Sequence, residues 1–109
     1  MTDILMLRRQ AVLAGSAWAV EHGIPASKLD AAVERYAASV KADVVAGRHG
    51  AVSKHLKMSR EAMLAAVDAD MREAVDGGVE EKVEFLLDYA IGSLEPARFA
   101  AALKDVVGR

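Results

Sequence analysis

Acidic side chains recur at helical spacing in the second half of the chain. Glu80, Glu84 and Asp88 stand four residues apart, so a helix would place all three on one face. Like charges at this spacing weaken a helix slightly. The pattern is typical either of a solvated, solubilising surface or of a docking surface for a basic partner. The candidate protein-binding residues are Glu73, Asp76, Glu80, Glu81, Glu84 and Asp88.

Metal-binding and catalytic patterns are absent from the sequence. There is no cysteine, and His22, His49 and His55 form no pair at the i, i+4 spacing that helical metal ligands use. No glycine-rich phosphate loop or nucleophile elbow occurs. We therefore expect a non-catalytic protein with no metal and no cofactor.

A basic segment precedes the acidic region. Residues 48–60 contain four lysine or arginine residues and two histidines, with no carboxylate. Within it, the stretch VSKHLKMSREAML at residues 52–64 resembles a helix-turn-helix motif. Ser53 is the small residue where the two helices would cross, and Ser59 would cap the second helix. Lys57 departs from the pattern, because glycine is usual at that point of the turn.

The resemblance implies DNA binding, with cations near phosphates and polar side chains near base edges. It covers 13 of the 109 residues and identifies no family. Asp68, Asp70 and Glu73 follow in the supposed recognition helix and would repel phosphates, so a purely structural helical corner is the alternative. The candidate DNA-binding residues are Ser53, Lys54, His55, Lys57, Ser59 and Arg60.

Hydrophobic periodicity predicts an all-α fold, a single domain over residues 1–109 built from five or six short helices. The expected helices cover residues 3–22, a stretch from Ser27 to Gly47, residues 51–56, a stretch that Ser59 caps, residues 79–91 and residues 97–107. Gly23 is expected as a left-handed C-cap, with Pro25 after it. Ser27 is expected as an N-cap, with Asp30 completing a near-capping box. Pro96 suits a first helical turn.

Small residues recur in the first predicted helix. Ala11, Gly15 and Ala19 stand four residues apart within a run, residues 11–20, that has no charge. Such a stripe permits a close backbone approach, either inside the helical domain or to a second copy of the chain. We therefore predict a homodimer through Ala11, Gly15, Trp18 and Ala19.

Charge and hydropathy narrow the function without identifying it. The chain is 53% hydrophobic with a net charge of −2, which excludes intrinsic disorder. The run at residues 11–20 is too short to span a membrane, which needs roughly 20 apolar residues. Arg8 and Arg9 before that run resemble a twin-arginine signal, but Asp3 precedes them and the run is short. We expect a cytoplasmic location.

Two functional hypotheses follow from the charge distribution. Residues 60–95 contain ten acidic and three basic side chains, whereas the basic segment lies just before them. The first hypothesis is a small helix-turn-helix DNA-binding regulator whose partner is DNA. The alternative is an inhibitor or adaptor, of the immunity, anti-activator or phage-inhibitor type, whose acidic helical face binds a basic protein.

Overall fold

The computed structural model describes residues 3–48, 58–88 and 95–107, and these residues contain five helices and no strand. The helices are α1 (Ile4–Glu21), α2 (Ala26–Val45), α3 (Arg60–Asp76), α4 (Val79–Leu86) and α5 (Pro96–Val107). The predicted all-α fold is confirmed. The short helix predicted at residues 51–56 lies outside the described residues.

Most helix ends lie where local sequence signals place them. Gly23 and Gly47 follow α1 and α2 with positive φ angles of 62° and 81°, a conformation that glycine adopts without steric cost. The Ser59 hydroxyl accepts a hydrogen bond from the Ala62 N–H at 3.2 Å, which caps α3. Pro96 is the first residue of α5.

The prediction for the start of α2 is wrong. The helix begins at Ala26 with Pro25 as its N-cap, and the Pro25 carbonyl accepts from the Lys28 N–H at 3.0 Å. Proline fixes φ near −65°, so the chain enters the helix directly from Pro25. Ser27 and Asp30 therefore lie inside the first turns of α2 and form no capping box.

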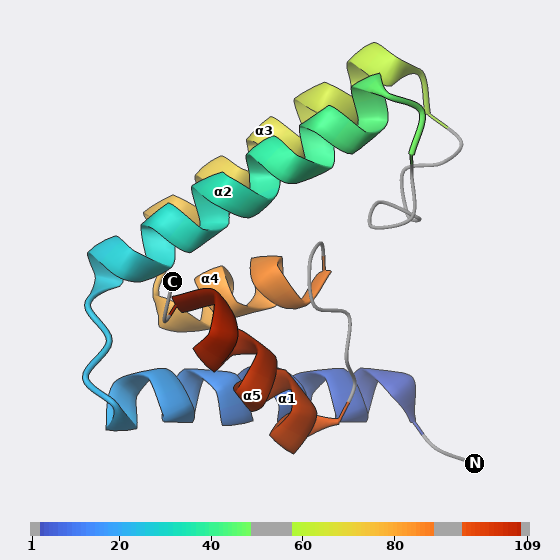
Figure 1. Ribbon diagram of the computed structural model, residues 1–109. Coiled ribbons are helices and arrows are strands. Elements are labelled where there is room, and N and C mark those ends of the chain that lie inside the picture. Colours follow the sequence, from blue (N-terminus) through green and yellow to red (C-terminus); the bar gives the residue numbers. More distant parts are fainter. Residues whose placement is uncertain (1–2, 49–57, 89–94, 108–109) are drawn as a thin grey trace.

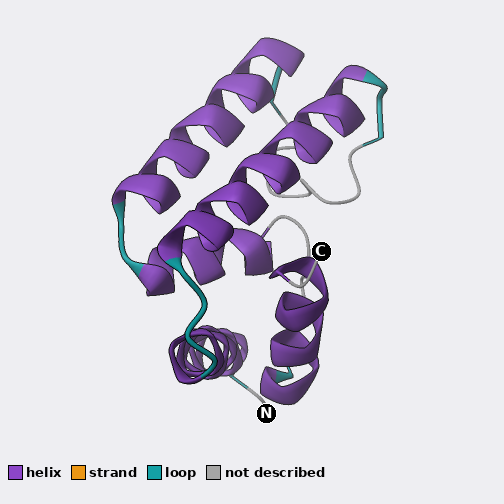
Figure 2. Cartoon of the chain, turned by 60° about the vertical axis from the view of Figure 1, so that its left-hand side comes forward, coloured by secondary structure: helices purple, strands orange, loops and turns teal. Residues whose placement is uncertain are grey.

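The α2–α3 hairpin forms one layer of the fold, and the crossed helices α1 and α5 form the other (Figure 1). Helices α2 and α3 run antiparallel, side by side, as Figure 2 also shows. Helix α5 packs on α1, and α4 lies between these two layers with contacts to α1, α2 and α3. Its central position explains why Val83, Phe85 and Leu86 are all buried. Beyond Leu86, the described chain continues in a wider π-type turn at residues 87–88, and residues 89–91 of the predicted helix lie outside the described part.

The small-residue stripe of α1 packs inside the chain. Ala11 and Ala19 are almost fully buried, and a Cβ atom at Gly15 would lie 2.7 Å from Phe99 Cε1 and 2.9 Å from Val83 Cγ1. The close approach is therefore made to α4 and α5 of the same chain. A second copy cannot reach Ala11, Gly15 or Ala19 in this fold, so these three residues do not form the predicted interface between copies. Trp18 is half-buried and packs against the core.

The opposite face of α1 is exposed and apolar. Leu5, Met6 and Val20 are 76%, 57% and 69% exposed, respectively. Among the described helices, none is both long enough and apolar enough to cross a bilayer.

Candidate functional site: an acidic hollow between α3 and α4

Carboxylates from two helices surround one hollow of about 180 Å³. Asp70 and Glu73 share a face of α3 because they are three residues apart. Glu84 lies on α4, and Asp88 lies in the π-type turn that follows it. The sharp turn at Gly77 and Gly78 brings these residues together. The residues that line this acidic hollow are Asp70, Glu73, Ala74, Glu81, Glu84, Phe85 and Asp88.

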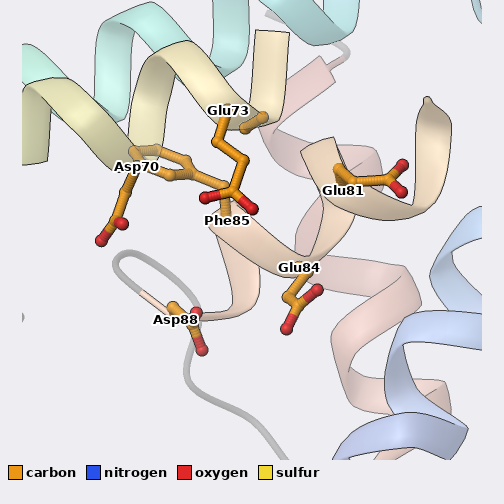
Figure 3. A pocket seen from close by; sticks show the side chains of 7 residues that line it. Asp70, Glu73, Glu81, Glu84, Phe85 and Asp88 are labelled. Carbon is orange, nitrogen blue, oxygen red and sulfur yellow. The ribbon is translucent and has the colours of Figure 1, made fainter. Parts of the chain in front are cut away.

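Figure 3 shows Asp70 and Glu73 extending from α3 and Glu84 and Asp88 beyond the Phe85 ring, while the Glu81 carboxylate points away from these four. Phe85 is only 4% exposed, so it forms an apolar floor under an acidic rim. Among the described residues of the lining, none carries a hydroxyl, thiol, amine or imidazole group. The arrangement can attract and hold a cation with an apolar stem.

Part of the acidic rim is already neutralised by α1. Arg8 Nη2 lies 2.9 Å from Glu84 Oε1, and Arg8 Nη1 pairs with Asp88. Hydrogen bonds from its guanidinium to Asp88, and then to Glu84, raise the pKa of Arg8 above its ordinary value, although partial burial opposes the rise. One edge of the acidic hollow is thus held to α1.

The other carboxylates of the acidic hollow differ in whether they already have an interaction partner. Glu81 Oε2 accepts a hydrogen bond from the Gly78 N–H at 2.7 Å and so caps the start of α4. Asp70 also has an interaction partner. Glu73 is exposed and forms no ion pair among the described residues. It is the carboxylate of the acidic hollow most available to a ligand.

Four of the six acidic residues predicted from spacing lie together here, namely Glu73, Glu81, Glu84 and Asp88. The other two do not line the hollow: Asp76 is the last residue of α3, and Glu80 lies on another side of α4. Asp70 and Phe85 were missed. Two signals in the sequence could have found them. Asp70 lies three residues before the predicted Glu73, and Phe85 directly follows the predicted Glu84.

The predicted DNA-binding residues are mostly beyond the described chain. Ser53, Lys54, His55 and Lys57 lie outside the described residues, while Ser59 caps α3 and Arg60 is exposed at its first position. The rest of α3 is acidic, and its Asp68 pairs with Lys41 of α2 at 2.8 Å. The described part of α3 therefore offers no basic surface beyond its first turn and Arg72.

His22, which lies within the described part of the chain, does not line the acidic hollow. His22 follows α1, stacks on the Trp18 ring at 4.5 Å, and its Nδ1 lies 2.9 Å from the Trp18 carbonyl oxygen. His49 and His55 lie outside the described residues. The described residues also contain no group of three or more side chains suited to hold a metal ion.

Comparison with protein-family models, curated proteins and solved structures finds no match to this chain.

Proposed function

We propose that this protein is a non-catalytic binding protein that receives a basic segment of a partner protein in the acidic hollow. The observation that supports this proposal best is the gathering of four carboxylates, those of Asp70, Glu73, Glu84 and Asp88, around one hollow with an aromatic floor. A solubilising surface needs no such gathering, since it works equally well with dispersed charges.

The size of the hollow favours one side chain over a small-molecule ligand. Its volume of about 180 Å³ is below the roughly 300–1,000 Å³ that is usual for small-molecule sites. A lysine or arginine side chain can lay its methylene stem on Phe85 and direct its charge to the rim. Glu73 is the expected ion-pair partner, because Glu84 and Asp88 are shared with Arg8.

The same charges disfavour a nucleic-acid ligand at this surface. Phosphates would be repelled by Asp70, Glu73 and Glu84, and DNA binding depends on cations that release counterions. The experiment must therefore distinguish peptide binding in the acidic hollow from DNA binding through the predicted basic segment.

The experiment is a titration of two labelled peptides, one of alternating arginine and alanine and one with glutamate in place of arginine. The test variant combines Glu73→Gln with Glu84→Gln, which removes two charges while the new amide at position 84 can still accept a hydrogen bond from Arg8. The matched control combines Glu34→Gln with Glu61→Gln, two exposed residues outside the lining of the hollow. We expect the basic peptide alone to bind and the test variant to lose about tenfold in affinity, mostly in association rate.

Equal losses in the test and control variants would show that only overall charge matters, and would refute the acidic hollow as the site. The same titration is repeated with labelled duplex DNA. Tighter binding of DNA than of the basic peptide, abolished by Lys54→Ala, Lys57→Ala and Arg60→Ala together, would replace this proposal with the helix-turn-helix hypothesis.

A further inference from the structure

The exposed face of α1 is continuous with a groove at the start of α4. The groove has a volume of about 620 Å³ and is mainly apolar. Its lining residues are Leu13, Ser16, Ala17, Val20, Glu21, Val79 and Glu80. Leu13 is 43% exposed and Val20 is 69% exposed, so large apolar side chains face solvent along much of the helix. Isolated exposed leucines are ordinary, but a continuous apolar face indicates an interaction surface.

The charges along this face are arranged in a self-complementary way. Arg9 lies on the exposed face, one turn before Leu13, and Glu80 borders the groove beside Ser16. Neither Arg9 nor Glu80 forms an ion pair among the described residues. The N-terminal half of the face is thus basic and its C-terminal half acidic.

We propose that a second copy of this chain covers this face, with the two α1 helices antiparallel and a two-fold axis at Leu13. Met6 and Val20 lie seven residues on either side of Leu13, so each Met6 packs on Val20 of the other copy. Arg9 lies four residues before Leu13, and Glu80 borders the groove beside Ser16, three residues after Leu13. Arg9 therefore pairs with Glu80 of the other copy and supplies the cation that Glu80 lacks.

A two-fold axis explains this pattern better than an unrelated partner does. In an isologous interface the same patch serves both copies, so it must contain both halves of every contact. The Met6–Val20 contact and the Arg9–Glu80 ion pair both meet that condition with one axis. This surface is distinct from the small-residue stripe of α1 and from the acidic hollow, so the proposal is independent of the basic partner.

Sedimentation velocity tests the proposal directly, because it measures whether the chain is a monomer or a dimer. We expect the wild type to sediment as a dimer of the 11.6 kDa chain at about 100 µM and to dissociate on dilution. Leu13→Glu, or Val20→Glu as a second variant, should give monomers at the same concentration, because the carboxylate would be buried at the axis. Both sites are exposed in the single chain, so circular dichroism should show an unchanged helical fold.

A charge-reversal series tests the register. Arg9→Glu should weaken the dimer at least tenfold, and adding Glu80→Arg should restore it because the pair is re-formed with opposite sign. Arg35→Glu on the exposed side of α2 is the matched control and should leave the dimer intact. A wild type that stays monomeric at about 100 µM, a dimer that survives Leu13→Glu, or a double reversal that does not restore association would each overturn the proposal.

Discussion

Gly15 is the residue on which the packing of α1 against α4 and α5 depends most directly. Its missing side chain leaves room for the Phe99 ring and the Val83 methyl group, both fully buried. With few aromatic residues in the chain, Phe99 is the largest of the fully buried side chains. The close approach of α1 and α5 therefore depends on a single absent Cβ.

We expect Gly15→Leu to lower the free energy of unfolding by about 1–3 kcal/mol, because the new side chain overlaps Phe99 and Val83. Ala31→Leu on the exposed side of α2 is the control and should change stability by less than about 0.5 kcal/mol. Urea unfolding of both variants measures the difference. A Gly15→Leu variant as stable as the wild type would show that α5 does not pack on α1 as described.

Arg8 links α1 to α4 through Glu84 and Asp88. Arg8→Met should keep the apolar stem and remove the charge, with a loss of about 1 kcal/mol that shrinks in 1 M salt. Because folding raises the pKa of Arg8, its stabilisation is fully present below the ordinary arginine pKa and is lost only at higher pH. The Arg8 contribution should therefore be constant from about pH 6 to pH 9. Urea unfolding at several pH values, with Arg35→Met as control, tests this constancy.

At the scale of the elements, Lys82 joins three helices. Its Nζ donates to the Gly77 carbonyl at 2.8 Å and the Val75 carbonyl at 3.2 Å, and it lies 3.4 Å from Asp30 Oδ1 of α2. The side chain is 6% exposed. A cation at the C-terminus of α3 satisfies carbonyls that have no helical partner and interacts favourably with the helix dipole.

Lys82→Met should therefore destabilise the protein by about 1–3 kcal/mol, since it leaves the two carbonyls without their donor and the Asp30 carboxylate without its cation. The exposed Lys104 provides the matched control, and Lys104→Met should change stability little. Thermal unfolding followed by circular dichroism measures both variants. Equal melting temperatures for Lys82→Met and the wild type would contradict the role given to this ammonium group.

Sequence signals predicted the ends of helices where one local signal acts alone. The positive φ of Gly23 and Gly47 and the Ser59 cap need only a few neighbouring residues. The start of α2 was misplaced because Pro25 and Ser27 are competing local signals. Pro25 prevails, and Asp30 is engaged by Lys82, a contact between residues 52 positions apart.

The acidic hollow was predicted only in part, because half of it depends on contacts between residues far apart in the sequence. The i, i+4 spacing of Glu84 and Asp88 is visible within one helix, whereas the facing of Glu73 and Asp70 toward α4 depends on how the glycine turn folds α3 back. The pairing of Arg8 with α4 joins residues 76 positions apart and has no signature in local spacing. The small-residue stripe indicated a close helix approach but could not identify the neighbouring helix.

At the scale of the whole molecule, charge is nearly balanced overall but uneven in space. The net charge is −2, yet residues 60–95 contain ten of the sixteen carboxylates. Those at the acidic hollow repel one another across a short distance, and Arg8 compensates only the edge nearest α1. In the proposed function, this preformed surface costs some stability in the free protein and regains it when a cation arrives.

This trade-off predicts opposite effects of one substitution. Glu73→Gln should raise the free energy of unfolding by about 0.2–0.5 kcal/mol, because one like-charge repulsion is removed. The same change should weaken binding of the arginine-alanine peptide, because Glu73 is exposed and forms neither an ion pair nor a capping hydrogen bond among the described residues. Glu34→Gln, with the same change of net charge on α2, should alter neither quantity. Thermal unfolding with and without peptide measures both effects, since bound peptide raises the melting temperature by mass action. A Glu73→Gln variant that is more stable yet binds the peptide as tightly as the wild type would identify the hollow as a strained solubilising surface and not as a docking site.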